Sequence, residues 1–288
     1  MKIILLGRDG QLGRELHSYA LKHKYKITAL NRKDLDLMDK AKIESKLIGK
    51  KADVLINATG YMNVADSENN PTLAFLINAV AVKYLAVVTQ EMGAKFVNYS
   101  SDYVFDGAKG RPYRETDAPN PLQVYGFSKY CGELMAANYN KDSYVIRTCG
   151  IYGGQMGAKS KGNFVLNLLR DVKGQKEIEV SSEQIVSPTY APELAKKTFE
   201  LVESKLPAGI YHLVNEGKCS WAEFSAEIIK LAGLNVKVIP MDRKGFSGGA
   251  KRPIFSALLN TKAKKLGIVL PQWKSSLNEY ITFLKNNN

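Results

Sequence analysis

The sequence of 288 residues is poor in the residues that cross-link a chain, bind metal ions or anchor it in a membrane. Its three cysteines, Cys131, Cys149 and Cys219, are far apart and show neither CxxC spacing nor a nearby histidine cluster. We therefore expect reduced thiols, no bound metal and a cytoplasmic location. No apolar run approaches the roughly 18 residues that span a bilayer. The first apolar run ends at Gly7 and is typical of a strand rather than a signal peptide, so we expect no membrane partner.

Acidic residues are also scarce, because 28 Asp and Glu stand against 41 Lys and Arg, which gives a net charge of +13. This balance favours an anionic partner, such as a nucleic acid, an acidic surface or a phosphorylated ligand. The basic residues are scattered along the chain without the interleaved aromatic residues of a nucleic-acid groove, which argues against a nucleic-acid partner. With 45% hydrophobic residues, the chain can bury a large core.

The first half of the chain alternates short apolar runs with amphipathic stretches. Strands are predicted over 2–6, 26–30, 54–57, 95–99 and 143–147, and helices from about 11 and over 40–47, 71–92 and 125–139. This rhythm predicts an α/β fold with a doubly wound parallel sheet. After residue 147 the pattern loosens, with helices predicted over 164–172, 191–203 and 221–231 and strands over 177–180 and 210–213. The last part indicates a smaller lobe beside the sheet.

Gly7, Gly10 and Gly13 form a GxxGxxG motif directly after the first predicted strand and at the start of the first predicted helix. In such a turn side chains must be absent, so that the backbone around Gln11 and Leu12 and the positive helix end can approach a pyrophosphate. A glycine-rich turn without a ligand is the alternative. The position between strand and helix favours a Rossmann-type dinucleotide site.

The end of the second strand indicates which dinucleotide would bind. A carboxylate at this point usually holds the free ribose hydroxyls, but the strand ends in Arg32, which could pair with a 2′-phosphate. This favours NADPH, with NADH as the alternative. The other expected cofactor contacts follow the second and third strands, and they are Asp36, Leu37, Ala58, Thr59 and Gly60.

Tyr125 and Lys129 form the chain's only YxxxK pair, and this spacing places both side chains on one face of a helix. Ser101 follows the strand predicted at 95–99, at the carboxyl edge of the sheet where ligands bind. A nearby cation favours the phenolate, so we expect Lys129 and the positive charge of the nicotinamide together to bring the pKa of Tyr125 closer to neutral pH. The three residues predict carbonyl reduction, with Ser101 binding the carbonyl, Tyr125 donating the proton and Lys129 also holding the cofactor ribose.

These motifs, together with SDYVFDG at 101–107, Gly132-Glu133 and RPIFS at 252–256, resemble the dTDP-4-dehydrorhamnose reductase family of extended short-chain dehydrogenases/reductases. The resemblance covers nearly the whole chain. It implies NAD(P)H-dependent reduction of the 4-keto group of dTDP-6-deoxy-L-lyxo-4-hexulose to dTDP-L-rhamnose, for cell-surface polysaccharide. It also implies that Asp102 and Tyr103 face the sugar, with a buried packing role as the alternative for Tyr103. Arg252 could neutralise the diphosphate, or it could merely cap a helix or pair on the surface.

On this resemblance we expect residues 1–150 and about 163–208 to form the NAD(P)-binding Rossmann domain. The substrate-binding lobe is expected at about 151–162 and 209–288, and a homodimer is an open expectation. Trp221 and Trp273 are interpreted as packing residues of this lobe. Glu15 lies where some relatives place a metal at a subunit contact, but one carboxylate does not define a metal site.

Three departures from the family pattern concern the substrate more than the chemistry. The run 147–150 reads RTCG where the family has RTSW, the run 59–68 differs throughout, and Ser101 replaces a threonine while keeping the hydroxyl. A 4-ketoreductase of another sugar nucleotide, such as a UDP-linked amino sugar, is therefore an alternative. A non-catalytic, NADP-binding regulatory subunit is an alternative of a different class, although the intact Ser101, Tyr125 and Lys129 argue against it.

Overall fold

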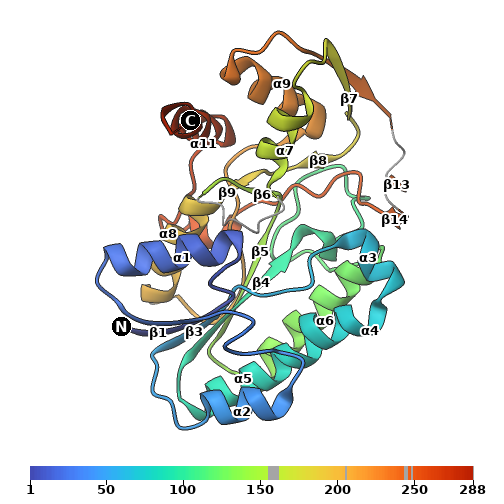
Figure 1. Ribbon diagram of the computed structural model, residues 1–288. Helices are drawn as coiled ribbons and strands as arrows, with labels where there is room; N and C mark the ends of the chain where they lie inside the picture. The colour runs from blue at the N-terminus through green and yellow to red at the C-terminus, as the bar shows by residue number, and fades with distance from the viewer. Residues whose placement is uncertain (155–161, 205, 243–245, 248, 288) are drawn as a thin grey trace.

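A computed structural model describes residues 1–154, 162–204, 206–242, 246–247 and 249–287 of the chain. Its centre is a six-stranded, all-parallel sheet in the order β10-β5-β4-β3-β1-β2 (Figure 1). The strands are β1 (Lys2–Leu6), β2 (Lys26–Leu30), β3 (Val54–Asn57), β4 (Lys95–Ser101), β5 (Ser143–Thr148) and β10 (Gly209–His212). The chain runs from β1 outward to β2 and then returns to β3 on the other side of β1. Such a reversal opens a crevice at the carboxyl ends of β1 and β3, the two strands between which the chain changes direction.

Helices cover both faces of this sheet because its strands are apolar on both sides. Ile3 and Leu5 of β1 pack with α1 (Gln11–Lys22) and α8 (Ala191–Glu203) on one face. Ile4 and Leu6 point to the opposite face and pack with α2 (Lys40–Leu47) and α5 (Ala81–Glu91). Helix α6 (Val124–Tyr139) lies beside α5 on that same face (Figure 1). The predicted doubly wound α/β fold is confirmed.

The predicted helix over 71–92 consists of α4 (Pro71–Phe75), a π-helical turn η1 (Leu76–Val80) and α5, and it is preceded by α3 (Val64–Asn69). By length and composition alone the 21 residues Pro71–Glu91 are long and apolar enough to cross a membrane, although polar residues such as Asn78 and Lys83 interrupt the apolar run. Half of their most apolar window is buried inside the protein. The sheet and α6 account for that apolar face.

A smaller lobe stands over the carboxyl edge of the sheet (Figure 1). Its aromatic core includes Tyr152, Tyr190, Phe224 and Tyr280. The larger elements around it are α7 (Phe164–Asp171), α9 (Trp221–Ala232) and α11 (Trp273–Asn286), with the parallel pair β7 (Glu177–Ser181) and β12 (Lys237–Met241). Short pieces complete it: β6 (Ile151–Tyr152) with β9 (Thr189–Tyr190), β8 (Ile185–Val186) with β11 (Cys219–Ser220), and β13 (Phe246–Ser247) with β14 (Ala250–Lys251).

Four elements lie on the other side of the predicted boundaries between the two parts. Helix α7 and strand β7, predicted within the nucleotide-binding part at 163–208, pack with α9 and pair with β12 in the lobe. Strand β10, predicted in the lobe at 209–288, is instead the edge strand of the main sheet, and α10 (Thr261–Lys264) packs on it. The chain therefore crosses between the two parts several times. Of the lobe segment predicted at 151–162, residues 155–161 lie outside the described part.

Candidate active site

A cleft of about 740 Å³ runs along the carboxyl ends of β1 to β5, between the main sheet and the lobe. Its floor is formed by the turns after these strands, and its far wall includes Val186 and Trp221 from the lobe. The predicted cofactor and catalytic residues line it with one exception, because Gly13 lies behind the turn. The sequence motifs therefore meet in one place although they are spread over the first half of the chain.

The glycine motif forms a tight turn at one end of this cleft. Gly7 has a φ of +85°, and a Cβ on it would lie 2.7 Å from the carbonyl oxygen of Ala58, so only glycine fits. A Cβ on Gly13 would lie 2.0 Å from the Gly7 carbonyl oxygen, which shows that Gly13 lets α1 pack on the turn. Gly10 caps α1 without a side chain, and apart from the Gly7 carbonyl, 3.3 Å away, a Cβ there would meet only open space. The uncapped first turn of α1 therefore suits a phosphate.

Side chains of both positive and negative charge lie near the end of β2. The Arg32 side chain is 76% exposed, and its Nε lies 3.9 Å from Asp36 Oδ2, so it is free to turn toward an anion. Asn31 donates to Asp9 Oδ2 at 2.9 Å, which brings a carboxylate from the glycine turn to the strand end. Sequence reasoning missed Asp9, because it precedes the expected position by a whole strand. The end of β2 can therefore offer a cation to a 2′-phosphate or a carboxylate to a free ribose hydroxyl.

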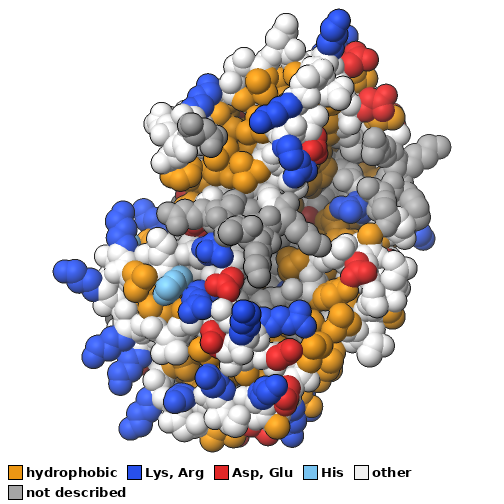
Figure 2. All heavy atoms as spheres, in the orientation of Figure 1, with side chains coloured by type: hydrophobic (Ala, Val, Ile, Leu, Met, Phe, Trp, Pro, Cys, Tyr) orange, Lys and Arg blue, Asp and Glu red, His pale blue; other side chains and the backbone are white. Residues whose placement is uncertain are grey.

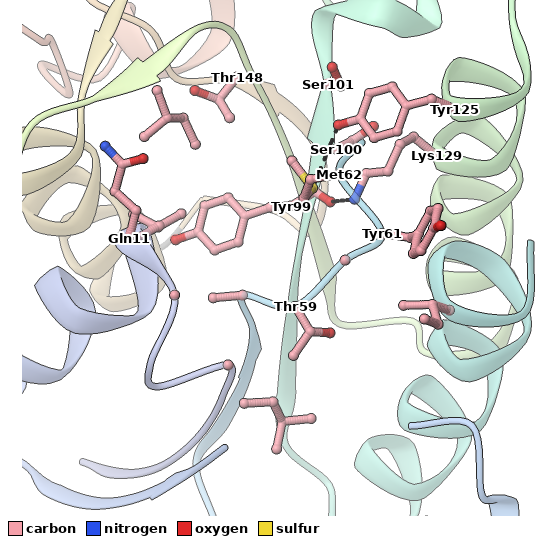
Figure 3. Close-up of a pocket in the computed structure, with 18 of the residues that line it drawn as sticks. Gln11, Thr59, Tyr61, Met62, Tyr99, Ser100, Ser101, Tyr125, Lys129 and Thr148 are labelled. Atoms are coloured by element: carbon pink, nitrogen blue, oxygen red, sulfur yellow. Dashed lines mark hydrogen bonds between the residues drawn. The ribbon is translucent and has the colours of Figure 1, made fainter. Parts of the chain in front are cut away.

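Tyr125, Lys129 and Ser101 come together where α6 meets the end of β4 (Figure 3). Tyr125 lies in the first turn of α6 and Lys129 one turn later, and the Lys129 ammonium donates to the carbonyl of Tyr99 at 2.6 Å. Ser101 ends β4 beside Thr148 of β5. All three side chains are almost completely buried, yet they line the cleft. This arrangement can bind a carbonyl group and supply it with a proton.

Burial controls the protonation of this group. It raises the pKa of Tyr125 well above its usual value, against the effect of a hydrogen bond with Ser101. In the chain alone the expected lowering by Lys129 does not appear, because burial outweighs the effects that lower the pKa of Tyr125, while the Lys129 ammonium uses one of its three donors on the Tyr99 carbonyl. Burial also lowers the pKa of Lys129 to about 8, although the nearby Glu133 carboxylate opposes this. At neutral pH Tyr125 is therefore a protonated phenol, as a proton donor must be.

Asp102 lines the cleft, but protein groups occupy its carboxylate. Its Oδ2 accepts from Ser256 Oγ at 2.6 Å and from Cys149 Sγ at 3.1 Å, and its Oδ1 accepts from Ser101 Oγ at 3.0 Å. These contacts favour a positioning role for Asp102 over the expected contact with the sugar. Burial raises its pKa, and the three donors oppose this.

Arg252 lies behind Tyr103 and outside the cleft wall, and its Nη1 donates to the Tyr103 hydroxyl at 3.1 Å. Its Nε is buried without a hydrogen-bond partner. Among the described residues Arg252 forms no ion pair, so the alternative of a surface pair has no support in this part of the chain. Tyr103 lines the cleft, and Arg252 contacts the phenol of Tyr103 without lining the cleft itself.

A buried ion pair links α6 to β5 next to the active-site residues. Arg147 of β5 binds Glu133 of α6 through two hydrogen bonds of 2.8 and 2.6 Å, and both side chains are at most 2% exposed. Glu133 also accepts from Ser100 Oγ at 2.5 Å, which ties α6 to β4 next to Ser101. Helix α6 is thereby fixed relative to the two strands that carry the rest of the site.

The cleft lining also contains residues that were not predicted as site residues, among them Tyr61, Met62 and Trp221. Tyr61 and Met62 follow the predicted contact Gly60 and lie beside Lys129 and Tyr125 (Figure 3). The Met62 sulfur is 3.8 Å from the Tyr125 hydroxyl. Trp221 was interpreted as a packing residue only. In the described part of the chain no group of three or more His, Cys, Asp or Glu side chains could hold a metal ion.

The fold and the arrangement of these residues define a Rossmann-type, nucleotide-dependent reductase of the extended short-chain dehydrogenase/reductase class. A family model described as RmlD substrate binding domain matches residues 1–286. Together with the relatives below, this match shows that the chain belongs to the dTDP-4-dehydrorhamnose reductase family, whose members are NAD(P)H-dependent oxidoreductases.

Three relatives show how close the similarity is. A dTDP-4-dehydrorhamnose reductase from Clostridium acetobutylicum has 34% identity and a TM-score of 0.93, over 99% of this chain and 100% of that one. The dTDP-4-dehydrorhamnose reductase from Bacillus anthracis, solved in complex with NADP, has 32% identity and a TM-score of 0.91, over 98% and 99%. The spore coat polysaccharide biosynthesis protein SpsK of Bacillus subtilis has 33% identity over 280 residues, 97% of this chain and 96% of its own length.

Proposed function

We propose that this protein reduces the 4-keto group of dTDP-6-deoxy-L-lyxo-4-hexulose with NADPH and forms dTDP-L-rhamnose for cell-surface polysaccharide. The observation that carries the proposal is the protonated, buried Tyr125 beside Ser101 in a cleft that also contains the glycine turn. The family of the chain supplies the substrate class. The spore coat relative supports a role in polysaccharide synthesis.

NADPH fits the residues at the glycine-turn end of the cleft. The uncapped start of α1 and the glycines around it would hold the pyrophosphate, and Arg32 would pair with the 2′-phosphate. Asp36, Leu37, Ala58, Thr59 and Gly60 would border the adenosine and the following ribose. The bound cofactor would supply the hydride that reduces the carbonyl carbon. NADH remains the alternative, and Asp9 is the carboxylate that would support it.

The chain's own residues would perform the proton chemistry. In the free site the Ser101 hydroxyl donates a hydrogen bond to Asp102 Oδ1 at 3.0 Å and accepts one from the backbone amide of Tyr103 at 3.1 Å. With substrate bound, the hydroxyl would donate to the substrate carbonyl instead, which polarises the carbonyl group. Tyr125 would donate its proton to the same oxygen, and the Lys129 ammonium would stabilise the phenolate that remains. Lys129 would also hold the nicotinamide ribose hydroxyls.

The test is to mix the protein with dTDP-6-deoxy-L-lyxo-4-hexulose and follow cofactor oxidation by absorbance, with NADPH and with NADH. We expect faster oxidation with NADPH, and a loss of about a thousandfold or more in Tyr125→Phe, because this variant lacks the hydroxyl that donates the proton. The Tyr125→Phe variant should still bind NADPH, which shows that the loss is chemical.

Two other outcomes would replace this proposal. Reduction of a UDP-linked amino-sugar ketone alone would keep the chemistry and change the substrate, an outcome that Gly150 in place of tryptophan makes worth testing. Binding of NADPH without reduction of either ketone would favour a regulatory subunit. We further propose a cytoplasmic location, which the three free thiols support, and a homodimer, which the exposed side chains of Phe127 and Leu134 on α6 support.

A further inference from the structure

Trp221 is held at the edge of the cleft by well-defined local structure. It is the first residue of α9, directly after the cap Ser220, whose side chain and that of Glu223 form a reciprocal capping box. The preceding residue pair of β11 is hydrogen-bonded to β8, whose Val186 also lines the cleft. The backbone of Trp221 is therefore fixed on both sides, and its position relative to the cleft is set by the fold.

The indole ring is buttressed on its lobe side and open on its cleft side. Its centroid lies 4.4 Å from that of Phe164 and 6.0 Å from that of Phe224, in tilted and edge-on arrangements. Trp221 also packs against the buried cluster that contains Cys149 and Val186, yet it remains partly exposed and lines the cleft. A large aromatic surface that is held rigidly costs little entropy when a ligand packs on it.

Gly150 makes room for this ring. A Cβ on Gly150 would lie 3.3 Å from Cη2 of Trp221, so any side chain at position 150 would press against the indole. Gly150 also has a φ of +50°, which disfavours other residues. The indole of Trp221 therefore occupies space that is open because Gly150, just beyond β5, has no side chain.

The position of Gly150 indicates which part of a ligand the ring would meet. Ser101 pairs with Thr148 in the sheet, and Gly150 is two residues beyond Thr148. With consecutive Cα atoms about 3.8 Å apart, the Cα of Gly150 lies at most about 7.6 Å from that of Thr148, the strand neighbour of Ser101. That distance is the size of one sugar ring, whereas the nucleotide must extend further away.

We propose that Trp221 forms an aromatic subsite on which the sugar ring of the substrate packs, and that it determines which sugar nucleotide is reduced. A pyranose offers a face of C–H groups, and a 6-deoxy sugar adds a methyl group, both of which suit an indole beside Val186 and Cys149. The inference rests on the proposed function and adds the residue that recognises the sugar.

Tryptophan fluorescence tests this directly, because the chain has only two tryptophans and Trp273 is 5% exposed in the lobe core. Trp273→Phe leaves Trp221 as the single emitter. With NADP present, we expect dTDP-L-rhamnose to change its emission and protect it from acrylamide, and dTDP to do neither. Equal effects of both ligands would assign the ring to the nucleotide, and no effect of either would remove the subsite; both results overturn the proposal. Should Trp273→Phe fail to fold, the difference between wild type and Trp221→Phe gives the same signal.

Kinetics provide the second readout and separate this inference from the proposed function. We expect Trp221→Ala to raise the KM for the dTDP-linked ketone about tenfold, as for the loss of one aromatic contact, with the KM for NADPH unchanged. Trp221→Phe should recover most of the difference. If the wild type reduces the ketone and Trp221→Ala has the same KM, only the subsite is wrong. If the wild type does not reduce it, the proposed function is wrong, and the titration with dTDP-L-rhamnose still decides the subsite.

Discussion

Burial acts in the same direction on Tyr125 and Lys129, since it favours the neutral form of each. The phenol keeps its proton, while the pKa of the ammonium falls to about 8 from its usual value of 10.5. The proposed mechanism needs the neutral phenol but the charged ammonium. Glu133, one turn beyond Lys129 on α6, is the group that opposes the loss of this charge.

The first prediction is therefore an alkaline limit on activity. Below about pH 8 Lys129 is charged, so kcat/KM for NADPH should be constant there and fall as the pH rises through about 8. Between about pH 8 and 10.5 the unfolded chain holds a proton that the folded chain lacks, so this group's contribution to stability rises with pH while activity falls. Deprotonation of Lys129 lowers activity while its contribution to stability rises, whereas alkaline unfolding would lower both activity and stability. The measurement is a pH–rate profile beside urea unfolding at each pH.

Glu133→Gln supplies the control for this prediction. Removing the carboxylate removes what raises the pKa of Lys129, so the alkaline limit should move to lower pH. The variant also leaves Arg147 without its ionic partner and will be less stable, so its profile is recorded where urea unfolding shows it folded. An unchanged limit in the folded variant would mean that another group sets it.

At the same scale, sequence patterns predicted the residues whose type is required by the chemistry. Ser101, Tyr125 and Lys129 stand in recognisable spacing, and each lines the cleft. Trp221 could not be predicted, because its role depends on the empty space above Gly150, more than 70 positions earlier in the chain. The engagement of Asp102 by Ser256 and Cys149 was hidden for the same reason.

At the scale of elements, two glycines of one motif have different tasks. Gly13→Ala would place a Cβ 2.0 Å from the Gly7 carbonyl oxygen, which must push α1 away from β1. We expect a loss of several kcal/mol in unfolding free energy, typical of a steric clash in a packed core, and weak NADPH binding. Gly10 has a φ of −72°, and a Cβ there would meet only the Gly7 carbonyl oxygen, at 3.3 Å. The unfolding free energy of Gly10→Ala should therefore stay within about 1 kcal/mol of the wild-type value.

The comparison of these two variants uses chemical denaturation and NADPH titration. Gly10→Ala should bind NADPH more weakly although it folds normally, because its methyl group would point into the space proposed for the pyrophosphate. Equal stability of the two variants would contradict the assigned packing role of Gly13. Normal NADPH binding by Gly10→Ala would contradict the position proposed for the cofactor.

Strands β1 and β3 were predictable because each is an almost continuous apolar run that is buried on both faces. The bounds of β1, β2 and β3 agree with the prediction to the residue. Helix α11 was missed, and its cap Gln272 makes no side-chain hydrogen bond that would mark the start. Strand β12 was missed as well, since only its pairing with β7, about 60 residues earlier, gives it a place. Elements that depend on distant partners leave little trace in local sequence.

At the scale of the whole molecule, the net charge of +13 acts on anionic ligands before they touch the cleft. Figure 2 shows Lys and Arg side chains distributed over the nucleotide-binding part of this face, with acidic side chains among them. Both proposed ligands carry a diphosphate. A positive molecule attracts them over distances of about the Debye length, which is roughly 10 Å at 0.1 M salt.

The last prediction is that the association rate with NADPH falls about tenfold between low salt, roughly 10 mM, and roughly 300 mM, because salt screens this attraction. NADH lacks the 2′-phosphate, so its rate should fall less. Stopped-flow fluorescence of the two cofactors measures both rates. In Arg32→Gln the cation proposed for the 2′-phosphate is absent, and the two cofactors should then show more similar dissociation rates while the salt effect of the remaining charge persists. If NADPH and NADH dissociate alike from the wild type, Arg32 does not bind the 2′-phosphate, whereas slower dissociation of NADH would make Asp9 the residue that selects the cofactor.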